Sequence, residues 1–166
     1  VYGKDDDMKV TGKRHEMRFR YRVGFEPSGR ICAADFEVRS NGGAFADLST
    51  AVLERTMLHL DNAYYLPAVR IGARVCRTNL PPNTAFRGFG GPQGMAAIEK
   101  VMEDIAQTLG MDALDVRKAN VYGDSPRNVT PYGQVLEENL LPEIFDDLEQ
   151  SAAYRARRAE VEEFNR

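Results

Sequence analysis

Strict alternation of apolar and charged residues near the start of the chain is the pattern that most restricts its fold. Every second residue from 17 to 25 is apolar and arginines stand between them, namely Met17, Phe19, Tyr21, Val23 and Phe25 against Arg18, Arg20 and Arg22. A period of two is typical of a strand with one buried face. A turn sequence at 26–29, with Pro second and Gly fourth, leads into a second alternating run from Cys32 to Arg39. We therefore expect residues 14–40 to form a long β-hairpin.

The arginines of the first run would lie on the face of the hairpin opposite its apolar side chains. We expect that face to contact solvent, and a ligand-binding stripe is the alternative interpretation. The whole chain of 166 residues carries a net charge of −3, so its composition does not favour nucleic acid as a partner. Its length suits one domain. No apolar run approaches the roughly 20 residues that a membrane-spanning helix needs.

Cysteines and chain ends bear on where the protein resides. Cys32 and Cys76 lie far apart in strand-like segments, and we expect two reduced, half-buried thiols in a cytoplasmic protein. No leader sequence indicates secretion. The chain begins at Val1 rather than Met, and its last segment, Ala152–Arg166, has the composition of a charged helix without a cap. We therefore expect a piece of a longer protein.

Helix signals follow the hairpin. Ser49 would cap a helix that runs to about Tyr64. The side of this helix opposite its apolar stripe would carry Arg55, His59 and Asn62. After an alternating strand at 69–76, a helix is expected from Pro92 to Leu109, with Gly110 as its stop. The starts of three further helices are marked by Asp112, Pro142 and Ser151. Strands followed by helices, without a strand–helix–strand rhythm, predict an α+β fold of two layers, in which an antiparallel hairpin sheet packs against helices.

A glycine-rich segment precedes the longest of these helices. Residues 84–93 read TAFRGFGGPQ, so that Gly88, Gly90 and Gly91 surround Phe89. Glycines allow close approach of the backbone to a bound group, and a helix start offers free N–H groups. Together they favour a site for an anion or an oxygen-rich cofactor. The alternative that spacing leaves open is a turn that lets a helix pack tightly.

Common nucleotide and hydrolase motifs do not fit this segment. A dinucleotide fingerprint would need glycine where Gln93 stands, and a P-loop would need a Lys-Ser or Lys-Thr pair after the glycines. The chain has no G-x-S-x-G elbow. His15 and His59 form no metal-ligand spacing with the cysteines.

The amino-acid sequence of the loop and of the residues before it resembles that of a known family. Residues 78–93, TNLPPNTAFRGFGGPQ, closely resemble the molybdenum-cofactor subunit of xanthine dehydrogenases and xanthine oxidases. The strings at 54–64 (ERTMLHLDNAY), 8–25 and 160–166 resemble the same family, so the resemblance covers nearly the whole chain. In this family a molybdenum ion, held by a pterin dithiolene, hydroxylates a purine carbon with oxygen from water.

The resemblance implies roles for three residues. Arg87 matches a position whose backbone and surroundings contact the molybdenum centre. It would therefore bind the cofactor next to the metal ion. Phe89 matches an aromatic residue that packs against the substrate ring, and Arg55 matches an arginine that binds a purine oxygen. Related aldehyde oxidases usually lack that arginine and commonly carry Phe where this chain has Gly91. The resemblance therefore favours a purine such as hypoxanthine or xanthine.

The resemblance also implies what lies elsewhere. The catalytic glutamate, a second substrate-binding glutamate, most pterin contacts, the iron–sulfur clusters and FAD belong to other domains or subunits of a dimeric parent. We expect residues 1–166 to be a fragment of the molybdopterin-binding domain, with a core at about 8–125 and an extension at 126–166 toward the next domain. Alone it would be folded but inactive. The alternatives are an aldehyde or other N-heterocycle oxidase of the same superfamily, and a non-catalytic interaction domain.

Overall fold

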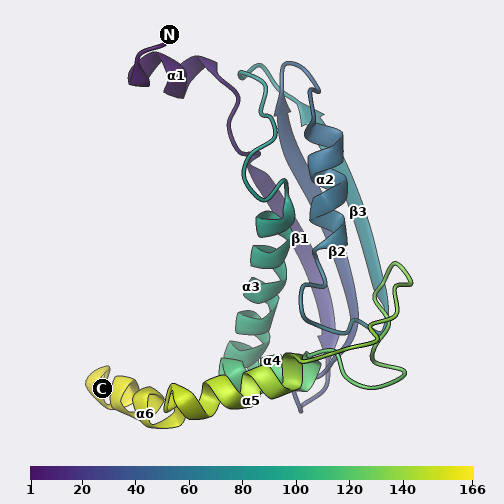
Figure 1. Ribbon diagram of the computed structural model, residues 1–166, viewed down its shortest axis with the longest axis vertical. Helices are drawn as coiled ribbons and strands as arrows, with labels where there is room; N and C mark the ends of the chain where they lie inside the picture. The colour runs from purple at the N-terminus through teal and green to yellow at the C-terminus, as the bar shows by residue number, and fades with distance from the viewer.

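The computed structural model describes all 166 residues and is built around a three-stranded sheet in the order β1-β2-β3 (Figure 1). Strand β1 (Met17–Phe25) runs antiparallel to β2 (Ile31–Gly43), with Tyr21 opposite Phe36. The predicted hairpin is confirmed. Its alternation arises as expected, because the apolar side chains of β1 turn inward and its arginines are exposed.

The third strand shows where the prediction was wrong. Strand β3 (Val69–Arg77) pairs with β2 in parallel, with Ile71 beside Phe36, and helix α2 (Ser49–Leu58) connects the two strands. Strand β2, helix α2 and strand β3 thus form a strand–helix–strand unit, whereas the sequence pattern had predicted none. Alternation reveals which residues face the core, but it is the same for parallel and antiparallel neighbours.

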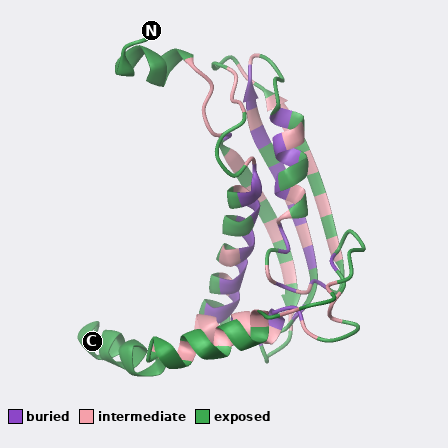
Figure 2. Cartoon of the chain, in the orientation of Figure 1, coloured by how far each residue is buried: buried purple, intermediate pink, exposed green.

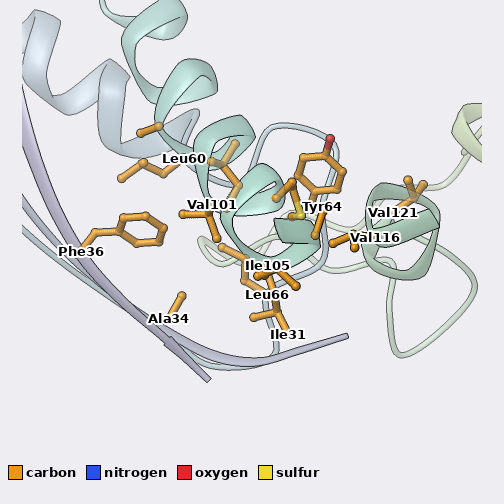
Figure 3. Packing of buried hydrophobic residues seen from close by; sticks show 14 of the residues in the cluster. Ile31, Ala34, Phe36, Leu60, Tyr64, Leu66, Val101, Ile105, Val116 and Val121 are labelled. Atoms are coloured by element: carbon orange, nitrogen blue, oxygen red, sulfur yellow. The ribbon is translucent and has the colours of Figure 1, made fainter. Parts of the chain in front are cut away.

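Two helices cover one face of the sheet. Helix α3 (Gly91–Leu109) and helix α2 share a buried cluster with β2, and partly buried apolar side chains of β1 and β3 pack against it. Phe36 and Ala34 on β2 point toward Val101 and Ile105 of α3 (Figure 3). The α+β class, with a hairpin sheet against helices, is confirmed. Helix α3 also starts and stops as expected, with Gly90 and Gly110 in left-handed conformations at its two caps.

The remaining helices flank this core. Asp112 caps α4 (Ala113–Asn120) as predicted, because its side chain accepts a hydrogen bond from the backbone N–H of Leu114 at 2.8 Å. Helix α1 (Lys4–Val10) lies at one end, whereas α5 (Leu141–Ser151) and α6 (Tyr154–Phe164) extend away from the sheet (Figure 1). None of these three contains a buried residue (Figure 2). No helix in the structure has both the length and the apolar character to span a bilayer.

Two predicted caps and one helix end were wrong. Ser49 is the first residue of α2 rather than its cap, since its hydroxyl is bound to Nε2 of His15 at 2.7 Å. The helix ends at Leu58, because Asn62 adopts a left-handed conformation in the turn that follows. Ser151 ends α5, and Ala153 precedes α6.

The two thiols are both free, but Cys32 is exposed. The expectation of a half-buried residue was therefore wrong at that position, which lies beside the irregular pairing between β1 and β2 at Gly24/Phe25. Cys76, near the end of β3, is partly buried as expected.

Candidate functional site

The glycine-rich loop consists of two overlapping tight turns. The N–H of Phe89 donates to the carbonyl of Phe86 at 2.8 Å, and the N–H of Gly91 donates to the carbonyl of Gly88 at 3.0 Å. Gly88, Phe89 and Gly90 all have positive φ, at 89°, 50° and 96°. Glycine adopts such angles freely, but Phe does not. A non-glycine residue held in this region often marks a functional site.

Close backbone contact fixes this loop against helix α2. A Cβ atom at Gly90 would collide with the carbonyl oxygen of Val52, and one at Gly94 with the carbonyl oxygen of Thr56. The hydroxyl of Thr56 lies 3.0 Å from the carbonyl oxygen of Gly90. Gly90 and Gly94 therefore serve the tight packing that the structural interpretation of the loop predicts.

The same contact brings the polar side of α2 to the loop. A Cβ at Gly91 would lie 3.1 Å from Cδ2 of His59, so the imidazole touches the start of α3. Arg55 lies on α2 directly before Thr56, whose hydroxyl and carbonyl oxygens contact Gly90 and Gly94. Arg55 is exposed and makes no hydrogen bond or ion pair within the chain. Its guanidinium therefore has no partner within the chain.

The tip of the loop is open and rich in donors. Arg87 is exposed and unpaired, and Phe89 is partly exposed. The backbone N–H groups of Arg87, Gly88 and Gly90 donate to no acceptor in the chain. Successive free N–H groups in a turn form a concavity for anionic or oxygen-bearing groups. The structure thus brings the three predicted residues to one region, with Arg87 and Phe89 on the loop and Arg55 on the helix packed against it.

Sequence reasoning missed Arg14. Its guanidinium carbon lies 4.5 Å from the centroid of the Phe86 ring, so that side chain stacks on the loop. Its Nη1 atom is buried without a hydrogen-bond partner, as are Oε1 of Gln93 and Nδ1 of His59. No local signal could have found this contact, because Arg14 lies in an irregular segment before β1.

That irregular segment holds the loop from the other side. The N–H of Thr84 donates to the carbonyl of Lys13 at 3.1 Å, and the amide of Gln93 donates to the carbonyl of His15 at 3.3 Å. Burial lowers the pKa of His15, because it disfavours the charged form of the imidazole. A hydrogen bond from the Thr84 hydroxyl lowers the pKa of Asp47. The loop is therefore fixed between residues 13–15 and α2.

The chain offers no metal ligands of its own here. No group of three or more His, Cys, Asp or Glu side chains could hold a metal ion. One buried carboxyl, Asp61, has a pKa raised by burial, but it accepts a hydrogen bond from the Tyr122 hydroxyl at 2.6 Å and braces the end of α2. A metal at the loop would have to arrive with its own ligands. The loop region fits such a group. It offers backbone N–H groups without acceptors, glycines without side chains, and three buried polar atoms without hydrogen-bond partners.

Comparison with known proteins agrees with this fit. The family of the molybdopterin cofactor-binding domain matches residues 1–121. A xanthine dehydrogenase of Drosophila subobscura is 48% identical over 165 residues, which cover 98% of this chain and 12% of the relative. A xanthine dehydrogenase/oxidase of Mus musculus is 47% identical over 163 residues, with 98% and 12% covered. The chain therefore spans only a small part of these relatives.

Solved structures agree as well. An aldehyde oxidoreductase from Desulfovibrio gigas superposes with a TM-score of 0.83 at 29% identity, over 95% of this chain and 17% of that one. Quinoline 2-oxidoreductase from Pseudomonas putida 86 shares the fold, with a TM-score of 0.80 at 23% identity, over 98% of this chain and 22% of that one. The resemblance to xanthine dehydrogenases is confirmed, and the chain belongs to the molybdopterin cofactor-binding domain family.

Proposed function

We propose that residues 1–166 form part of a molybdenum hydroxylase that oxidises purines, hypoxanthine or xanthine, with oxygen from water. The identity to xanthine dehydrogenases supports this reaction. The observation that supports the purine assignment is the close packing of Gly90 and Gly94 on α2, the helix that carries the unpaired Arg55. Without the catalytic glutamate, the chain alone would be inactive.

Each residue has a distinct part in this proposal. The molybdenum–pterin group, when bound, supplies the oxidising equivalents. Backbone N–H groups at Arg87 and Gly88 would donate to its oxygen-bearing part, and the exposed Arg87 side chain would add positive charge nearby. Phe89 would pack its ring against the flat heterocycle. Arg55 would bind a purine oxygen and stabilise the negative charge that develops on it during hydroxylation.

Replacement of Arg55 by methionine in the full-length parent tests this role. We expect kcat/KM for xanthine to fall by roughly 100-fold or more, the loss typical of removing one donor to a developing oxyanion. Turnover of an aromatic aldehyde, which has no such oxygen, should persist. Arg157→Met is the matched control, because Arg157 is exposed on α6 and forms no ion pair. Unchanged purine turnover in Arg55→Met would refute the assignment.

An aldehyde or other N-heterocycle oxidase is the second candidate, since a solved aldehyde oxidoreductase shares the fold. Gly91 argues against it. Its missing side chain leaves room for the His59 ring, so the Phe that aldehyde oxidases commonly carry there would force that ring to move. A non-catalytic interaction domain is the remaining alternative. Molybdenum and pterin measured in the full-length parent would exclude it, and their absence would favour it.

The wider organisation belongs to the same proposal. A core at 8–125 would carry the site, and residues 126–166 would lead toward the next domain, which is supported by the absence of buried residues in α5 and α6. The remainder of the molybdopterin domain, together with iron–sulfur and FAD domains or subunits, would complete a dimeric parent. A cytoplasmic location is part of this proposal and accords with two free thiols.

A further inference from the structure

The face of the sheet turned away from α2 and α3 is strongly basic, although the chain as a whole is acidic. Six arginines extend from it against three carboxylates, namely Arg18, Arg20, Arg22, Arg39, Arg70 and Arg74 against Glu16, Asp35 and Glu37. No helix of the chain covers these side chains, and the arginines are all exposed (Figure 2). We call this surface the basic face.

Its charges are only partly compensated within the chain. Asp35 is bound by Arg70 at 2.7 Å and by Arg22 at 3.1 Å, and these bonds lower its pKa to about 2. Glu37 is bound by Arg39 at 2.6 Å. Arg18, Arg20 and Arg74 form no ion pair or hydrogen bond.

One row of the basic face is unfavourable as it stands. Strand pairing places Arg39 directly between Arg18 on β1 and Arg74 on β3. Like charges directly opposite one another destabilise a sheet, and this row contains three. A carboxylate-bearing segment of the same polypeptide would offset this repulsion in every folded molecule.

The shape of the basic face suits an inserted side chain. Gly72 leaves a gap on β3, where the nearest atom to a Cβ would be the carbonyl oxygen of Phe36 at 3.9 Å. The gap opens a hollow of 720 Å³ lined by Arg20, Arg22 and Arg70, with Asp35 and Glu37 among them. A smaller hollow of 210 Å³ lies at Arg18, Arg39 and Cys76. Carboxylate groups could enter beside these guanidinium groups and accept paired hydrogen bonds.

We propose that the basic face is the docking surface for an acidic segment of the same polypeptide, outside residues 1–166. The chain makes up 12% of its relatives, whose remaining length offers ample sequence for such a segment. Its carboxylates neutralise Arg18 and Arg74, and its backbone covers the neighbouring thiol of Cys76. This contact is independent of purine chemistry, so its failure would leave the proposed reaction untouched.

Cys76 is a built-in reporter for this contact. Alkylation by N-ethylmaleimide is followed by peptide mass spectrometry in the full-length parent, in wild type and in Arg18→Glu/Arg74→Glu. Charge reversal should eject the acidic segment and raise the labelling rate of Cys76 by roughly tenfold, as expected when a protecting contact opens. The new negative charges beside the thiol would themselves slow the reaction, because the thiolate is the nucleophile. Local electrostatics therefore cannot produce the expected increase.

A matched control and a salt series complete the test. Lys9→Glu/Arg157→Glu introduces the same charge change at exposed residues without ion pairs, and it should leave Cys76 labelling unchanged. In the wild-type parent, raising the ionic strength should also speed Cys76 labelling, because salt screens exposed charges. Labelling that is equal in the wild type and the Arg18/Arg74 variant, and indifferent to salt, would overturn the proposal.

Discussion

Replacing Gly90 by alanine tests whether backbone contact between the loop and α2 holds the site together. The new Cβ would collide with the Val52 carbonyl oxygen and lie 2.6 Å from the Thr56 hydroxyl oxygen, so α2 and the loop would have to separate. We therefore expect Gly90→Ala to destabilise the fold strongly. Gly110→Ala is the matched control, because Gly110 also has positive φ but has nothing within 4 Å of its Cβ position.

The magnitude follows from three contributions. Left-handed backbone costs a non-glycine residue roughly 1–2 kcal/mol, and this contribution applies to both variants. Gly90→Ala also loses the Thr56 hydrogen bond to the Gly90 carbonyl, worth about 1 kcal/mol. Insertion of a methyl group into a packed contact adds roughly 1–3 kcal/mol. We expect Gly90→Ala to lower the free energy of unfolding by about 2–4 kcal/mol more than Gly110→Ala.

Urea unfolding of the 166-residue chain, followed by circular dichroism, measures both variants under the same conditions. The difference between the free energies of unfolding of the two variants removes the cost of left-handed backbone, which both share, and leaves the cost of the collision at Gly90. If Gly90→Ala costs no more than Gly110→Ala, then close packing on Val52 and Thr56 does not fix the loop. The packing of α2, which carries Arg55, against the loop would then need another explanation.

Two further predictions concern Phe89 on the loop and the buried imidazole of His15. Phe89→Ala in the full-length parent should reduce purine turnover while molybdenum content stays normal, whereas loss of the metal would make Phe89 a structural residue. Because burial lowers the pKa of His15, the unfolded chain takes up a proton that the folded chain resists. The free energy of unfolding should therefore fall as pH drops below about 6.5, the ordinary value for histidine. His15→Asn should remove that slope in thermal melts between pH 7 and 5, and a persisting slope would contradict the assignment.

Much of the fold could be predicted because its signals are local. The alternation along 17–25 specified the hairpin, and Pro92 and Gly110 marked the two ends of α3. Helical spacing also predicted a helix through Arg55, which lies on α2. The motif of the loop indicated the family directly.

What could not be predicted depends on contacts between distant residues. The parallel pairing of β3 with β2 is set by the path of the chain through α2, which alternation does not encode. The early end of α2 accompanies a left-handed turn at Asn62 and the bond between Asp61 and Tyr122, 61 residues apart. Net charge concealed the basic face, because the acidic residues that outweigh its arginines lie mostly on helices.

The contact between Thr56 and Gly90 joins residues 34 positions apart, and it bears on the order of folding. The hairpin of β1 and β2 closes over a short turn and can form early, since local contacts cost little chain entropy. We expect the crossover through α2, the addition of β3 and the seating of the glycine loop to follow, because they join residues far apart in sequence. The loop that carries Arg87 and Phe89 would thus be among the last parts of the domain to assemble and among the first to open when the protein unfolds.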